Sequence, residues 1–153
     1  MKLRLIAVGK IREPYLAAAL ADFRKRLERY AAYEEVEVAV ARGTDPARAV
    51  REEGERIART LVAGEPFWLL DRAGSQLTSI ELSEKIQRTA AGGHTRLTLA
   101  VAGTYGAHSV LIERADFVWS LSSLTFLHEW ARAIVVEQLY RAAKIARGES
   151  YHH

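Results

Sequence analysis

The chain has 153 residues and a formal net charge of +3, and hydrophobic residues make up 49% of it against 27% for charged ones. That balance can bury a core, so it argues against disorder, collagen-like repeats and coiled coils, and the length favours one compact domain over residues 1–153. The chain has no cysteine, which excludes disulfide scaffolds, thiolate metal sites and cysteine nucleophiles.

Apolar runs of strand length alternate with segments of helical spacing along the whole chain. The expected strands are 2–8, 36–40, 66–70, 97–101 and 116–121, and the expected helices are 15–30, 46–63, 79–92, 109–114 and 128–147. Strands that read as buried on both faces and alternate with helices are typical of an α/β protein. We therefore predict a mostly parallel sheet of five or six strands with helices on both faces.

Local signals refine this prediction at several positions. Val36 and Val38 alternate with polar residues, which predicts a half-exposed strand near a sheet edge. Asp45-Pro46 predicts a helix start, and Thr78 followed by Glu81 predicts a capping box. The chain contains neither a signal-peptide pattern nor an apolar run of membrane-spanning length, so we expect a cytoplasmic protein.

The small net charge hides an uneven distribution. Residues 1–30 hold eight basic and three acidic side chains, whereas the rest of the chain has a small acidic excess. A basic surface that includes Arg24 and Lys25 is a possible nucleic-acid contact. The alternative is the solvated face of an ordinary helix.

Ligands of open parallel sheets bind beyond the carboxyl ends of the strands, so the loops after residues 8, 70, 101 and 121 are the expected place for a site. The first loop lacks the Gly-x-Gly-x-x-Gly spacing and the chain has no P-loop, which disfavours dinucleotide binding and nucleotide hydrolysis. Gly103-x-x-Gly106 follows a buried strand directly. Glycines there permit positive φ or the close approach of a ligand, although a plain turn is the alternative.

The segment 120–126 mixes small hydroxyls with apolar side chains just before the last helix. Such a loop could surround an aromatic base while its backbone reads the base edge, and the alternative is that a Ser or Thr caps the helix.

Arg132 falls inside the apolar stripe of the last helix. An unpaired cation there would be costly, so we expect a partner, either a carboxylate or carbonyl of the fold or a group at a subunit interface or substrate pocket. The histidines show no metal-ligand spacing, so we expect no metal site. The terminal Tyr151-His152-His153 could also be a frayed tail.

A set of motifs spread over the chain resembles a known family, the RlmH-type rRNA methyltransferases of the SPOUT class. The motifs are Met1-Lys2-Leu3-x-Leu5-Ile6-Ala7-Val8-Gly9-Lys10, Leu70-Asp71-x-x-Gly74, Gly103-x-x-Gly106, Ala115-Asp116-x-x-x-Ser120-Leu121-Ser122, Leu124-Thr125-Phe126-x-His128, Arg132, Glu137-Gln138-x-Tyr140-Arg141-Ala142 and Gly148-Glu149-x-Tyr151-His152.

The resemblance implies an S-adenosylmethionine-dependent enzyme that methylates N3 of a pseudouridine in 23S rRNA on the assembled ribosome. It also implies an α/β fold with a C-terminal trefoil knot, and a homodimer. The cofactor positions that it implies are Leu70, Gly103, Ser122, Ser123, Leu124, Thr125, Phe126 and Leu127.

Methylation of a neutral imide nitrogen requires that its proton leaves, so a general base or a group that stabilises the developing anion is expected. The candidates are His128, Glu137 and His152. The candidates for RNA contact are Arg132, Arg141, Tyr151, Arg24 and Lys25.

Three positions depart from the family pattern: Ala102 stands where the family has Gly, and Leu127 and Ser150 stand where it has Pro. A positive φ at Ala102 would cost on the order of 1 kcal/mol, and the lost prolines raise the entropy lost on ordering two segments. The alternative functions are a non-catalytic ribosome- or RNA-binding module with this fold, and a flavodoxin-like nucleotide- or flavin-binding protein, against which the missing phosphate loop argues.

Overall fold

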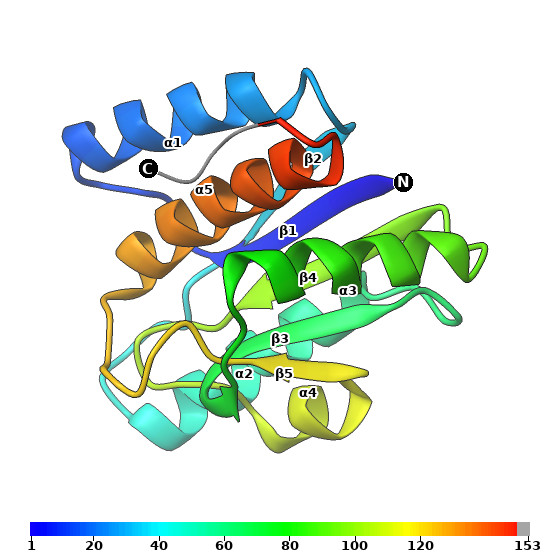
Figure 1. The fold of residues 1–153 in the computed structure, drawn as a ribbon. Coiled ribbons are helices and arrows are strands. Elements are labelled where there is room, and N and C mark those ends of the chain that lie inside the picture. The colour runs from blue at the N-terminus through cyan, green and yellow to red at the C-terminus, as the bar shows by residue number, and fades with distance from the viewer. Residues whose placement is uncertain (150–153) are drawn as a thin grey trace.

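A computed structural model describes residues 1–149 and contains one five-stranded sheet in the order β2-β1-β4-β3-β5, with every neighbouring pair parallel (Figure 1). The strands are β1 (Lys2–Val8), β2 (Tyr33–Val38), β3 (Phe67–Ser75), β4 (Arg96–Val101) and β5 (Phe117–Trp119), and the helices are α1 (Pro14–Leu27), α2 (Pro46–Thr60), α3 (Ser79–Ala91), α4 (Ser109–Arg114) and α5 (His128–Ala146). The predicted parallel α/β fold is confirmed, with five strands.

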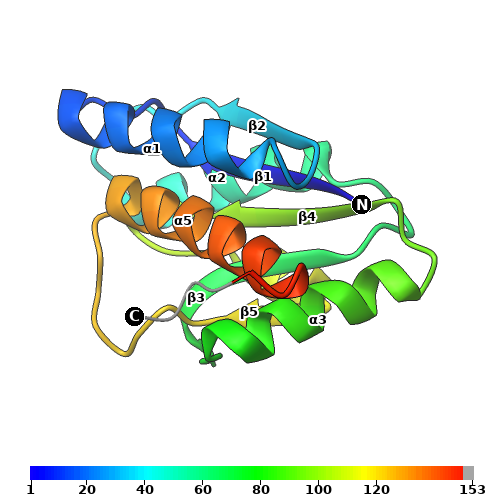
Figure 2. The same cartoon turned by 45° about the horizontal axis from the view of Figure 1, so that its top comes forward.

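Helices cover both faces of this sheet, as Figures 1 and 2 show. The core beneath α1, α3 and α5 includes Leu20, Leu82 and Leu139, and the core on the other face joins Ile57 of α2 to Leu111 of α4. Each strand of the sheet interior is therefore buried on both faces, which explains why its sequence is apolar throughout. β2 lies at the edge of the sheet, as its alternating sequence predicted.

Two predicted helix starts are confirmed by their hydrogen bonds. Asp45 Oδ1 accepts from Ala47 N at 3.1 Å, and Thr78 and Glu81 form both bonds of the capping box. β3 differs from the prediction, because it continues to Ser75 instead of ending near residue 70. Gly74 makes this possible: it lies so close to the backbone of Val118 that a Cβ would not fit between them.

α1 and α5 lie side by side in both views and begin at the same end of the molecule (Figures 1 and 2). The rings of Tyr15, near the start of α1, and Trp130, near the start of α5, have centroids 6.0 Å apart. Because all strands are parallel, their carboxyl ends also share one edge of the sheet. The loops expected to hold a ligand are thus brought together. The predicted trefoil knot stays a prediction.

Candidate cofactor site

A cavity of about 600 Å³ lies at this carboxyl edge, between the middle of β3, the loops that follow β4 and β5, and the first turn of α5. Apolar side chains form much of its wall, among them Val101, Trp119 and Leu121. Of the eight expected cofactor positions, seven line it; the exception is Ser123. The lining positions are Leu70, Gly103, Ser122, Leu124, Thr125, Phe126 and Leu127.

The glycine turn after β4 forms one wall of the cavity. Gly106 has φ +93°, and its N–H donates to the carbonyl of Gly103 at 3.1 Å. Glycine is favoured at position 103 for a different reason, because a Cβ there would overlap the carboxylate of Glu53 on α2. The strain considered for Ala102 does not arise, since only glycines have positive φ within residues 1–149.

The hydroxyls of the loop after β5 shape the loop itself. Ser120 Oγ donates to the carbonyl of Ser122 at 2.9 Å, and Leu124 N donates to Ser122 Oγ at 3.1 Å. The residue before α5 is Leu127, and α5 has no side-chain cap. The alternative that a Ser or Thr of this segment caps the helix is therefore wrong.

His128 is the only one of the three candidate bases that lines the cavity within the described residues. It is the first residue of α5, and its Nδ1 lies 3.5 Å from Thr104 Oγ1 in the glycine turn. Glu137 follows nine residues later, about 13 Å along the helix axis, and pairs with Arg141 at 2.7 Å. The structure does not bring Glu137 and Arg141 to the cavity of their own chain. His152 and Tyr151, like Ser150, lie outside the described residues.

Arg132 is 5% exposed and sits between α5 and the sheet. Its guanidinium pairs with Glu35 and, at 2.6 Å, with Glu37 of β2, and Nη1 donates to the carbonyl of Gly9 at 3.1 Å. Burial by itself lowers the pKa of Arg132, but the hydrogen bonds and ion pairs with Glu37 and Glu35 outweigh burial and raise that pKa. This geometry favours the structural pairing over the RNA contact proposed for Arg132.

Arg24 and Lys25 lie in the last turn of α1, at the end away from the cavity. Arg24 Nε donates to Glu28 Oε1 at 2.8 Å, and this hydrogen bond raises the pKa of Arg24. Their predicted RNA contact would therefore use a surface at the other end of α1 from the cavity.

The comparison with known families gives a match over nearly the whole chain. A family described as "Predicted SPOUT methyltransferase" matches residues 1–152, so it spans every strand-end loop of the site. The chain belongs to this SPOUT methyltransferase family. Curated relatives named "Ribosomal RNA large subunit methyltransferase H" include proteins from Gloeobacter violaceus (43% identical, covering 100% of this chain and 99% of the relative), Bifidobacterium adolescentis (40%, 99% and 99%) and Acetivibrio thermocellus (38%, 99% and 99%).

Several residues that line the cavity of this SPOUT chain were not among the cofactor positions expected from the sequence. Trp119 closes it from the end of β5, Tyr105 contributes from the glycine turn, and Ala131 contributes from one turn into α5. Asp71 and Arg72 also line it, and their position directly after the strand that ends at Leu70 was a usable signal. Trp119 and Ala131 carried no such signal, because their apolar side chains looked like ordinary core residues.

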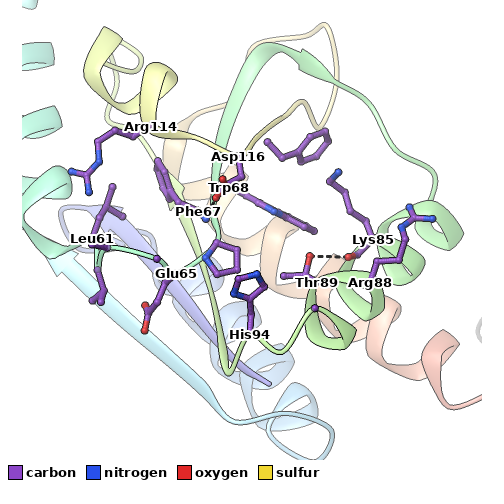
Figure 3. Close-up of a pocket in the computed structure, with 16 residues that line it drawn as sticks. Leu61, Glu65, Phe67, Trp68, Lys85, Arg88, Thr89, His94, Arg114 and Asp116 are labelled. Atoms are coloured by element: carbon purple, nitrogen blue, oxygen red, sulfur yellow. Dashed lines mark hydrogen bonds between the residues drawn. The ribbon is translucent and has the colours of Figure 1, made fainter.

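A second cavity, of about 690 Å³, opens at the opposite edge of the sheet, where β3 and β5 begin (Figure 3). Its charged side chains serve the fold: Asp116 Oδ2 accepts from Phe67 N at 2.8 Å, and Lys85 Nζ lies 4.1 Å from the centroid of the Phe117 ring. It contains none of the strand-end loops. Residues 1–149 hold no cluster of three or more side chains that could bind a metal, and no helix among them is long and apolar enough to cross a bilayer.

Proposed function

We propose that this SPOUT chain is an S-adenosylmethionine-dependent methyltransferase that acts on large-subunit rRNA, at N3 of a pseudouridine on the assembled ribosome. The observation that carries the proposal is the cavity at the carboxyl edge, lined by seven of the eight residues that the resemblance assigns to the cofactor. The names of the relatives, which share 38–43% identity over nearly the full chain, support the large-subunit rRNA as substrate.

The chemistry of the cavity fits such a cofactor. Its volume of about 600 Å³ lies within the range of small-molecule pockets, which is about 300–1,000 Å³. Leu70, Leu121 and Phe126 offer apolar surface for an adenine ring, and the hydroxyls of Ser122 and Thr125 offer hydrogen bonds. The carboxylate of Asp71 supplies a negative charge toward a cationic ligand.

S-adenosylmethionine, when bound, supplies an electrophilic methyl group on a sulfonium centre. The protein must then place the target nitrogen in line with that methyl group and exclude water. His128 is positioned for the proton, because it lines the cavity and is held near Thr104. We assign it the role of general base.

We also propose that the chain works as a homodimer in the cytoplasm. Large apolar side chains are exposed around the starts of α1 and α5: Tyr15 is 58% exposed, Trp130 43% and Leu127 69%. An exposed apolar patch of this kind fits burial against a second copy. Sedimentation should give a dimer at micromolar concentration, and a monomer alone would remove this part of the proposal.

Methyl transfer from labelled cofactor to ribosomes that lack the modification tests the function directly. We expect label in the large-subunit rRNA, with nucleotide mapping placing it on N3 of a pseudouridine. His128→Ala should lower the single-turnover rate by about 100-fold or more. Calorimetry separates the alternatives, because ribosome binding without any binding of S-adenosylmethionine would point to a non-catalytic module.

A further inference from the structure

The loop between β1 and α1, residues 9–13, is fixed to the start of α5 at both of its ends. At one end the carbonyl of Gly9 accepts from Arg132 Nη1 at 3.1 Å. At the other end Glu129 Oε2 accepts from Arg12 N at 2.9 Å and from Glu13 N at 3.4 Å. Two side chains one turn apart on α5 thus hold a five-residue loop in place.

This loop carries two exposed cations, Lys10 and Arg12. Neither side chain forms an ion pair or a side-chain hydrogen bond with any of residues 1–149. Of the other basic side chains in residues 1–30, Lys2 pairs with Glu34 and Arg26 pairs with Asp22 at 2.6 Å. The exposed side chains of Lys25 and Arg29 also form no ion pair within residues 1–149, but they lie at or just beyond the end of α1 that is away from the cavity. The β1–α1 loop is therefore a place where an ordered backbone presents cations that the fold itself does not use.

The position of the loop relates it to the cavity. It follows β1, which pairs with β4, and the glycine turn that follows β4 lines the cavity. Glu129, which holds the loop, comes directly after His128 in α5. Arg72, another exposed cation, lines the cavity from β3.

The acidic groups nearest the loop are already engaged or belong to it. Glu129 accepts from two backbone N–H groups, Glu35 and Glu37 pair with Arg132, and Asp71 Oδ1 accepts from Ala73 N at 2.9 Å, whereas Glu13 is part of the loop itself. Cations on a pre-ordered loop lose little conformational entropy when an anion binds, and Arg offers two parallel N–H donors that match a phosphate.

We propose that Lys10 and Arg12, with their loop held by Glu129 and Arg132, form a binding site for backbone phosphates of the RNA substrate beside the cofactor cavity. The proposal rests on the proposed function and adds to it the part of the chain that grips the RNA. Phosphate contacts set register and orientation without reading sequence. The role of this loop is therefore to hold the RNA backbone beside the cavity.

The first experiment compares large ribosomal subunits bound by the wild-type chain, by the double variant Lys10→Ala/Arg12→Ala, and by the matched control Arg51→Ala/Arg88→Ala. The control removes the same charge from exposed positions on α2 and α3, away from the cavity. The loop variant should bind about tenfold more weakly at low salt. The negative slope of log affinity against log salt concentration should become less steep by about 1 to 2. Equal losses in the control would overturn the proposal, because diffuse charge would then explain binding.

The second experiment tests the ordering of the loop. Glu129→Ala removes a negative charge near the site, so electrostatics alone would strengthen RNA binding. We expect weaker binding instead, by about threefold or more, because the loop loses its anchor and must be ordered on binding. Unchanged or tighter binding would overturn the positioning by Glu129.

Methylation kinetics separate this proposal from the proposed function. Lys10→Ala/Arg12→Ala should raise KM for ribosomes while kcat and the calorimetric affinity for S-adenosylmethionine stay near those of the wild type. If the wild-type chain methylates ribosomes and the variant keeps the wild-type KM, the phosphate site is wrong and the function stands. If the wild-type chain transfers no methyl group, the function itself fails.

Discussion

The carboxylate of Glu53 on α2 lies directly against Gly103 in the turn that lines the carboxyl-edge cavity, so close that a Cβ at position 103 would force one of the two to move. Glu53 is buried, and its Oε1 accepts from Ala41 N at 2.9 Å. One acidic side chain therefore joins the loop after β2, helix α2 and the glycine turn. The shape of the turn depends on this contact and on the positive φ of Gly106.

Gly103→Ala should push the turn away from Glu53 and disturb the cavity. We expect the affinity for S-adenosylmethionine to fall at least tenfold and the free energy of unfolding to fall by about 1–3 kcal/mol, as for other overpacked sites. Calorimetry and urea unfolding measure the two effects. Ala102→Gly is the matched control: Ala102 has no positive φ, so restoring the family residue should leave cofactor affinity within about twofold of the wild type. A large gain in affinity from Ala102→Gly would contradict this account of the turn.

Arg132→Met should strongly destabilise the fold, because it leaves Glu35 and Glu37 of β2 without their cation. Removing one partner of a buried ion pair typically costs about 3–5 kcal/mol. Arg24→Met, which breaks the exposed pair with Glu28, should cost no more than about 1 kcal/mol. Chemical denaturation of both variants checks the contrast, and similar losses would show that the Arg132 cluster is not a structural anchor.

Leu127→Pro should stabilise the chain without straining the loop before α5. Leu127 has φ −57°, within the range that proline fixes, and its N–H forms no backbone hydrogen bond with the described residues. A proline at a compatible position stabilises by about 0.4–1 kcal/mol, because it restricts the unfolded chain. A rise in the thermal midpoint of a few degrees is expected, and a lower midpoint would mean that the loop needs a different backbone here.

The capping box of α3 should make stability depend on pH in the acidic range. Hydrogen bonds from the backbone N–H and the hydroxyl of Thr78 lower the pKa of Glu81 below its ordinary value of 4.5. A lowered folded-state pKa stabilises the fold above pH 4.5, and this contribution disappears as the pH falls through the folded pKa. The melting-temperature difference between the wild type and Glu81→Gln should therefore be largest near about pH 7 and shrink in acid. A difference that stays constant down to about pH 3 would contradict the assignment.

Much of the fold follows from the sequence because its signals are local. Runs such as Leu97–Val101 are apolar on both faces of a strand, which requires helices on both sides of a parallel sheet. A parallel sheet in turn gathers its strand-end loops at one edge, so the order of the elements alone predicts that Leu70, Gly103 and Leu124 share one site. The helix caps Asp45 and Thr78 could also be predicted, because each forms its hydrogen bonds with a residue two or three positions further along the chain.

Other features depend on contacts between residues far apart in the chain. The helical period put Arg132 on an apolar face and demanded a partner, but only the packing of α5 against β2 selects Glu35, 97 residues away. The same is true of Glu53 against Gly103 and of Glu129 against the β1–α1 loop. The sequence by itself determined which elements form and at which edge of the sheet their ends meet. Which charged side chains are buried and paired depends on how the helices pack on the whole sheet. Only the tertiary structure decided that Arg132 anchors the fold while Lys10 and Arg12 are left to face a ligand.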